Sequence, residues 1–170
     1  WVSHTTSELV RRLKESGFVP LGRTTTSEFG LMGTTETLAE GRTCSPWSRD
    51  HMAGGSSGGA GAVVGAGIVP IATGSDGGGS IRIHAAACGV VGLKPTRGRV
   101  TWGPYAHEPL LGWAVHFLLS RSVRDTAAGL DVLAGPYPGD PWLTPDLPRP
   151  FLDEIALPPG RLRIAYCWEP

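Results

Sequence analysis

Two serines of this sequence stand inside separate glycine-rich turns. Ser56 lies in GGSSGG at 54–59, and Ser80 lies 24 positions later in GSDGGGSIR at 74–82. Glycine lets the backbone approach a ligand closely and adopt dihedral angles that are closed to other residues. A nucleophilic hydroxyl that works with backbone N–H groups as an oxyanion hole needs both properties. The two turns therefore predict acyl-transfer chemistry at a serine.

Other interpretations start from the same residues. Ser80 could be an ordinary helix N-cap, and a Gly/Ser run such as 54–59 is also typical of flexible linkers. The turn at 74–80 could instead cradle a phosphate. However, it lacks the GxxxxGK[ST] spacing of a P-loop, and no obvious acidic ribose contact follows about 20 residues later.

The composition is that of a globular protein, with 41% apolar and 18% charged residues. Its 15 basic and 15 acidic residues cancel, so we expect neither nucleic acid nor a membrane as partner. Three widely spaced cysteines without a CxxC pair favour free thiols in a reducing compartment. The scattered histidines predict no metal site. We therefore expect a cytoplasmic protein that needs no metal or organic cofactor.

Helical and extended patterns alternate along the chain, which predicts an α/β fold with a mixed β-sheet flanked by helices. Helices are expected at 6–16 (with a capping box from Thr5 to Glu8), 58–67, 81–87 and 122–134. Strands or extended segments are expected at 18–21, 68–73, 90–94 and 162–166. The stretch 23–53 has no sustained period, and such long loops usually surround a functional site.

The sequence resembles the amidase signature family of serine hydrolases. The resemblance rests on GGSSGG at 54–59, GSDGGGSIR at 74–82, CGVVGLKPT at 88–96 and the spacing of the first two motifs. It implies a partial single domain over 1–170, with a core at 5–135, a proline-rich excursion at 136–160 and a further strand beginning in 161–170. It also implies hydrolysis of a C–N carboxamide bond in a small molecule.

The same resemblance implies roles for individual residues. Ser80 would be the nucleophile that forms an acyl-enzyme, and Ser56, after a cis peptide bond, would relay a proton between a lysine and Ser80. The oxyanion hole would consist of the N–H groups of Gly77, Gly78, Gly79 and Ser80. Asp76 and Arg82 would pair and support this turn, Ser57 would cap the following helix, and Gly30 and Met32 would line the substrate pocket.

The base in the resembling family is a neutral lysine, and no lysine stands at the matching position here. Lys14 lies on the charged side of the helix expected at 6–16, and Lys94 belongs to the GLKPT motif, which is not the base in the family. The family's lysine lies upstream of the sequence that begins at Trp1. We therefore expect either a fragment that is inactive alone or a shortened relative that binds without cutting.

Two positions depart from particular branches of the family. His84 stands where proline is usual, and predicts either a pocket residue or a buried, hydrogen-bonded histidine. Ile83 stands where the A subunit of the tRNA-dependent amidotransferase commonly carries glutamine, and 24–36 is more similar to the free-standing amidases. Three hypotheses stay open: a free-standing amidase, the A subunit of a tRNA-dependent amidotransferase, and a non-catalytic binding module. The amide cleaved (linear, cyclic or aryl) and assembly as a homodimer are open as well.

Overall fold

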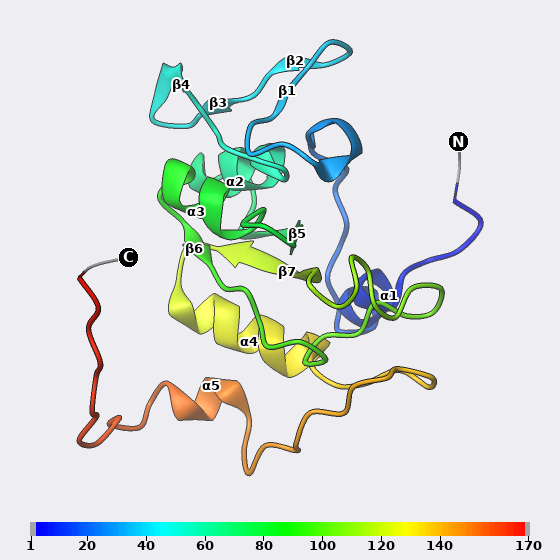
Figure 1. The fold of residues 1–170 in the computed structure, drawn as a ribbon, viewed down its shortest axis with the longest axis vertical. Coiled ribbons are helices and arrows are strands. Elements are labelled where there is room, and N and C mark those ends of the chain that lie inside the picture. The colour runs from blue at the N-terminus through cyan, green and yellow to red at the C-terminus, as the bar shows by residue number, and fades with distance from the viewer. Residues whose placement is uncertain (1–2, 169–170) are drawn as a thin grey trace.

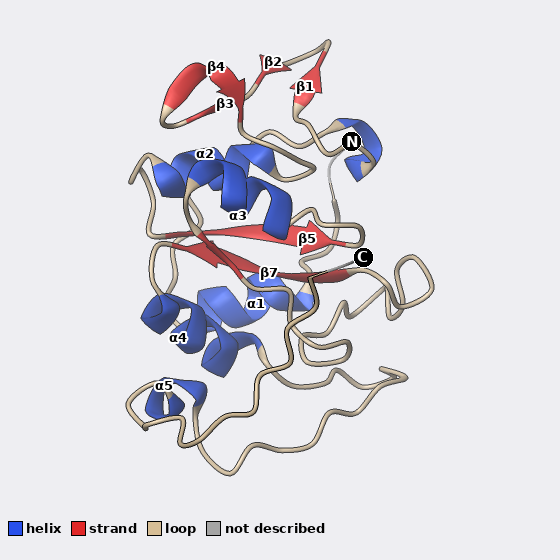
Figure 2. Ribbon diagram, turned by 60° about the vertical axis from the view of Figure 1, so that its left-hand side comes forward, coloured by secondary structure: helices blue, strands red, loops and turns tan. Residues whose placement is uncertain are grey.

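A three-stranded antiparallel sheet lies between two groups of helices in the computed structural model, which describes residues 3–168 (Figures 1 and 2). The strand order is β5 (Ile71–Asp76), β7 (Val115–Ser120) and β6 (Val91–Gly92). On one side lie α2 (Gly58–Gly65) and α3 (Arg82–Cys88), and on the other lie α1 (Glu8–Glu15) and α4 (Val123–Leu133). The expected layered α/β arrangement is confirmed, and the strand pairs of the described residues are antiparallel.

Strand β7 is the centre of the core. All six of its residues are buried, and it pairs with β5 along its whole length, from Ile71 opposite Ser120 to Asp76 opposite Val115. Phe117 and Leu118 pack in a cluster with α1 and α4, while Leu119 packs with α2 and α3. The sequence pattern did not predict this strand, because a continuous apolar run has neither the helical nor the strand period.

The four expected helices are present with small shifts at their ends. The first begins at Glu8 and not at residue 6, because the Ser7 hydroxyl is the cap and accepts from the Val10 N–H. The α4 helix begins after Ser122, whose hydroxyl accepts from the Asp125 N–H at 3.1 Å. The Arg12 guanidinium of α1 donates to the Leu133 carbonyl at 2.8 Å and thereby joins α1 to the end of α4.

Several expected strands differ from the structure. Residues 18–21 and 162–166 are exposed and form no strand, because neither apolar run has a partner strand among the described residues. The strand expected at 68–73 runs instead from Ile71 to Asp76, so it includes residues that were expected in the following turn. Residues 169–170 of the expected segment 161–170 lie outside the described residues.

The loop-rich stretch before α2 contains a 3₁₀ helix, Glu28–Gly30, and two small antiparallel hairpins. Their strands are β1 (Glu36–Thr37), β2 (Gly41–Arg42), β3 (Cys44–Ser45) and β4 (Ser48–Met52). The proline-rich excursion contains one short helix, α5 (Phe151–Glu154). Within residues 3–168, no helix has the length and hydropathy needed to cross a membrane.

Candidate active site

The turn that carries Ser56 is held by a buried threonine. The Thr35 hydroxyl donates to the Gly54 carbonyl at 2.9 Å and accepts from the Gly58 N–H at 3.1 Å. The Ser27 N–H donates to the Ser56 carbonyl at 2.9 Å. The peptide bond between Gly55 and Ser56 is cis, as the resemblance implied. The turn is therefore fixed from both sides before any substrate is present.

The turn that carries Ser80 is held by a buried carboxylate. Asp76 has no exposed surface, and its Oδ1 accepts from the Gly79 N–H at 2.8 Å. The Arg82 guanidinium forms the expected ion pair with it, with N···O distances of 2.9 and 3.0 Å. Burial alone would raise the pKa of Asp76, but the Arg82 side chain and the backbone N–H groups of Ile81 and Arg82 hold it below its usual value. The carboxylate therefore stays charged and fixes the turn.

The two turns lie against each other. The Ser57 hydroxyl accepts from the Ser75 N–H at 3.4 Å, and so joins the start of α2 to the end of β5. A Cβ atom on Gly54 would lie only 3.0 Å from the Cα atom of His84, one helical turn beyond Ser80. A side chain at residue 54 would therefore push the two turns apart, which explains the glycine there.

Neither serine hydroxyl is engaged in a hydrogen bond within the described part of the chain. Ser56 is buried and Ser80 is half-buried, and neither hydroxyl makes a hydrogen bond to a residue in 3–168. A Cβ atom on Gly30 would lie 3.8 Å from Ser56 Oγ, and the Met32 carbonyl packs against Gly55. The two residues expected at the substrate pocket thus border the first turn, where Met32 is 59% exposed.

The expected oxyanion hole needs one correction. The Gly79 N–H already donates to Asp76, so it does not face a ligand. The N–H groups of Gly77, Gly78 and Ser80 have no acceptor among the described residues. Nothing lies within 4 Å of a Cβ atom built on Gly78, so this part of the turn is open. The site therefore offers a half-buried hydroxyl beside free backbone donors, an arrangement that suits an acyl-transfer transition state.

Two supporting residues differ from the sequence-based expectation. Ser57 stands at the N-cap position of α2, but its side chain makes no capping hydrogen bond and contacts Ser75 instead. Thr35, which the sequence pattern did not single out as a support, accepts from the Gly58 N–H at the start of this helix. No local signal could have shown this, because Thr35 lies 23 positions before its donor in a stretch without period.

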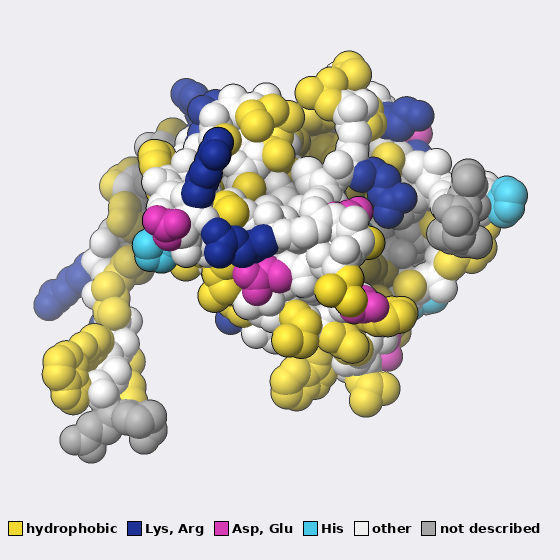
Figure 3. All heavy atoms as spheres, turned by 90° about the horizontal axis from the view of Figure 1, so that it is seen from above, with side chains coloured by type: hydrophobic (Ala, Val, Ile, Leu, Met, Phe, Trp, Pro, Cys, Tyr) yellow, Lys and Arg dark blue, Asp and Glu magenta, His cyan; other side chains and the backbone are white. Residues whose placement is uncertain are grey.

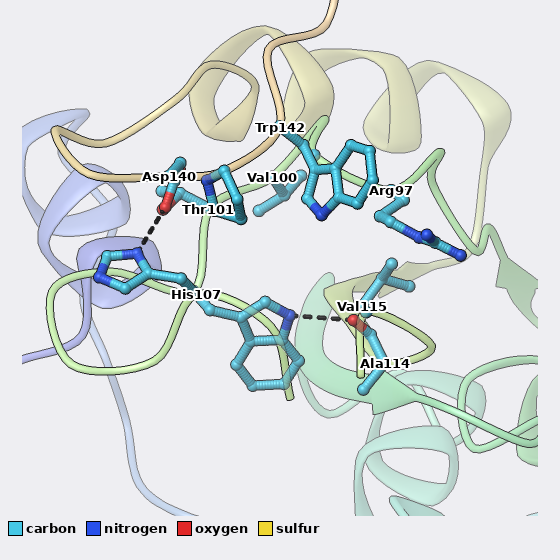
Figure 4. A pocket seen from close by; sticks show the side chains of 12 residues that line it. Arg97, Val100, Thr101, His107, Ala114, Val115, Asp140 and Trp142 are labelled. Atoms are coloured by element: carbon cyan, nitrogen blue, oxygen red, sulfur yellow. Dashed lines mark hydrogen bonds and ion pairs between the residues drawn. The ribbon is translucent and has the colours of Figure 1, made fainter. Parts of the chain in front are cut away.

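Neither described lysine makes a hydrogen bond to Ser56 or Ser80, but Lys94 and Gly77 of the Ser80 turn line one pocket together. Lys14 is exposed, and Lys94 Nζ donates to the Trp113 carbonyl at 2.9 Å. Figure 4 shows a pocket between the 97–115 loop and the proline-rich excursion, where His107 contacts Asp140, but neither serine lines it. No cluster of metal-ligating side chains occurs in 3–168.

Exposed hydrophobic side chains occur on the same end of the molecule as the hairpins. Figure 3 looks onto this end and shows several separate groups of hydrophobic side chains on it. Phe29, Leu31 and Met32, in the segment that borders Ser56, are 89%, 75% and 59% exposed. The border of the first turn is therefore apolar as well as open.

Replacing Thr35 by valine tests the support of the first turn. Valine keeps the shape but removes the hydroxyl, so the Gly54 carbonyl and the Gly58 N–H lose their buried partner. We expect the free energy of unfolding to fall by about 1–3 kcal/mol. Urea unfolding measures this change. Thr35→Ser keeps the hydroxyl and is the control; a valine variant as stable as the serine variant would show that the hydroxyl does not hold the turn.

Comparisons with known proteins show the family of the chain. The amidase family model matches residues 1–170. The 6-aminohexanoate-cyclic-dimer hydrolase of Paenarthrobacter ureafaciens is 49% identical over 157 residues, which cover 91% of this chain and 32% of that protein. A putative amidase of Synechocystis sp. is 47% identical over 160 residues, which cover 94% of this chain and 31% of that protein.

Solved structures give the same result. The structure of 6-aminohexanoate cyclic dimer hydrolase complexed with substrate superposes with a TM-score of 0.90 at 46% identity, covering 95% of this chain and 34% of that one. The A subunit of the glutamyl-tRNA(Gln) amidotransferase from Thermotoga maritima gives a TM-score of 0.75 at 39% identity, covering 82% and 30%. The chain belongs to the amidase signature family, and it spans about a third of the length of these relatives.

Proposed function

We propose that this chain is the serine-bearing part of an amide hydrolase that cleaves a small-molecule carboxamide through an acyl-Ser80 intermediate. The observation that carries the proposal is the pair of adjoining turns, each fixed by a buried side chain. The Ser56 and Ser80 hydroxyls make no hydrogen bond within residues 3–168. The complete protein, meaning the product of the whole reading frame, would supply the lysine base from a segment outside these 170 residues. The chain alone is then inactive.

The proposed reaction has two halves. Ser80 Oγ attacks the carbonyl carbon while its proton passes through the Ser56 hydroxyl to the lysine. The N–H groups of Gly77, Gly78 and Ser80 stabilise the oxyanion, and the amine leaves with the proton. Water then attacks the acyl-enzyme by the same proton route in reverse and releases the acid. These steps need no metal or organic cofactor.

The substrate class follows from the relatives. We propose a compact cyclic or linear oligoamide, since the cyclic-dimer hydrolases combine the highest identity among these relatives with a TM-score of 0.90. The apolar border of the first turn fits an aliphatic chain better than a charged one. We further propose that the protein acts in the cytoplasm.

The amidotransferase A subunit is the second candidate. It is favoured by a shared fold, but its TM-score and identity are lower than those of the cyclic-dimer hydrolase. An A subunit would form a stable complex with two other chains, whereas a free-standing hydrolase would turn over its substrate as a single polypeptide. Co-purification of two stoichiometric partners would favour this alternative.

A fluorophosphonate probe tests the proposed function. The complete protein should gain one probe mass per polypeptide, on the peptide that contains Ser80, and a cyclic diamide should slow the labelling. The 170-residue chain, without the base, should label at least about 100-fold more slowly. Absence of labelling in the complete, folded protein would refute the hydrolase and support a binding module.

A further inference from the structure

A buried histidine touches the candidate site and has no role in the proposed reaction. His84 has no exposed surface, and neither ring nitrogen has a partner at good hydrogen-bond geometry, although the Gly55 backbone lies close enough to act on the ring. The expected burial is therefore confirmed, but the ring has no well-formed hydrogen bond. Leaving a buried polar group unsatisfied costs about 1–3 kcal/mol, and such groups in native proteins call for an explanation.

The surroundings of His84 connect the two serine turns. On one side, a Cβ atom on Gly54 would lie 3.0 Å from His84 Cα and 3.1 Å from its backbone nitrogen. On another side, a Cβ atom on Gly61 of α2 would lie 3.1 Å from His84 Cδ2. The helical hydrogen bonds from Ile83 to Gly79 and from Ala85 to Ile81 place His84 one turn after Ser80. His84 therefore lies with its backbone against Gly54 and its ring against Gly61 of α2 and the Gly55 backbone of the Ser56 turn.

The charge of this imidazole is decided by few groups. Burial lowers the pKa of His84, while the Gly55 backbone and the charge of Asp76 act against this shift. Asp76 itself is paired with Arg82, and Cys88 on α3 is neutral because burial raises its pKa to about 11. Helix α2 and the turn at 54–57 carry no titratable side chain. The ring is therefore neutral near pH 7, and no carboxylate within contact distance is free to receive an added charge.

We propose that His84 is a positioning residue for the serine pair. Its neutral ring keeps the Ser56 turn packed against the Ser80 helix, and its protonation separates them. A charged imidazole in this closed space would lack water, and the carboxylate that acts on it, Asp76, is already paired with Arg82, so the packing against Gly54 would open. The inference rests on the proposed function only for its catalytic readout, because the packing itself can be measured without substrate.

The prediction concerns how labelling of Ser80 depends on pH. Unfolded histidine titrates near pH 6.5. Because the folded pKa is lower, the folded state loses stability relative to the unfolded state as the pH falls below that value. We compare the ratio of the labelling rate at pH 5.5 to the labelling rate at pH 8 in the complete protein. This ratio should be at least about 5-fold higher in His84→Gln than in the unaltered protein. Glutamine has a similar size and cannot take up a proton in this range.

His116 provides a matched control. It is also buried with a lowered pKa, of about 4, but its Nε2 contacts the Thr101 carbonyl and its ring stacks on Trp102. His116→Gln should change the stability of the fold and leave the pH profile of Ser80 labelling unchanged. Equal profiles in His84→Gln and the unaltered protein, or equal changes in both variants, would overturn the positioning role.

A second readout keeps the two proposals separate. In the unaltered protein, the protection of the amides of residues 54–58 against hydrogen exchange should fall as the pH falls from 7 to 5. In His84→Gln this fall in protection should be at least about 5-fold smaller. If no variant labels at Ser80 but the exchange follows this pattern, the hydrolase proposal fails and the role of His84 stands. Exchange that is independent of His84 would refute the inference even if Ser80 labels normally. Should the glutamine variant fail to fold, His84→Leu, which removes the unsatisfied atoms, carries the same comparison.

Discussion

Replacing Ser80 by alanine in the complete protein is expected to reduce the rate of amide hydrolysis on the order of 10⁴-fold or more. The hydroxyl is the group that would form the acyl bond, and Ser80 ends the turn in which the N–H groups of Gly77 and Gly78 have no acceptor among the described residues. The substrate should still bind, so kcat falls far more than KM changes. Steady-state kinetics with a cyclic diamide measures both constants.

Ser57→Ala is the control for this loss. Ser57 lies in the same cluster, but its hydroxyl accepts only from the Ser75 N–H at 3.4 Å. Its removal should lower the rate by less than about tenfold. A Ser80→Ala variant that keeps a tenth of the original rate would show that another residue is the nucleophile.

Replacing Asp76 by alanine is expected to give the largest loss of stability among the residues of the site. The carboxylate is fully buried and accepts from the N–H groups of Gly79, Ile81 and Arg82 as well as from the Arg82 side chain. Hydrogen bonds to a charged group contribute about 1.5–3 kcal/mol each, but Arg82 is half exposed and regains water. We therefore expect the free energy of unfolding of the complete protein to fall by about 3 kcal/mol.

The pH dependence of Asp76→Ala gives an independent check. The folded pKa of Asp76 is lowered below its usual value, so its contribution is fully present above about pH 4 and is lost as the pH falls through the folded pKa. The stability difference between the two proteins, measured by urea unfolding, should therefore be constant from pH 5 to 7 and shrink below pH 4. The free energy of unfolding of Asp76→Asn, which keeps one acceptor oxygen, should lie between those of Asp76→Ala and the unaltered protein. A difference that grows in acid would contradict the assigned role.

The local signals of the site could be found from the sequence, whereas a distant support could not. Glycine clusters around Ser56 and Ser80 are local signals, and the ion pair of Asp76 with Arg82 joins residues only six positions apart. Thr35 could not be found this way, because it meets its partners across 19 and 23 positions without a pattern of its own. The Gly79 donor was misassigned because spacing does not show which N–H groups a neighbouring carboxylate takes up.

The same distinction applies to the fold. Helices α2 and α4 follow from small-residue content and from a capping serine, which are local. The apolar run at 18–21 looks like a strand but has no partner strand in the described chain, whereas β7 looks like neither element and is the centre of the sheet. Strand pairing is decided by distant segments, so a single run of residues cannot reveal it.

Mass spectrometry of the complete protein, quenched during turnover of a slow amide, tests most directly whether these two turns form a hydrolytic centre. The acyl half of the substrate should appear on the peptide that spans 74–82, attached at Ser80, and should disappear on treatment with hydroxylamine. Turnover with an acyl group on any other residue, or with none on that peptide under conditions where deacylation limits the rate, would contradict the account.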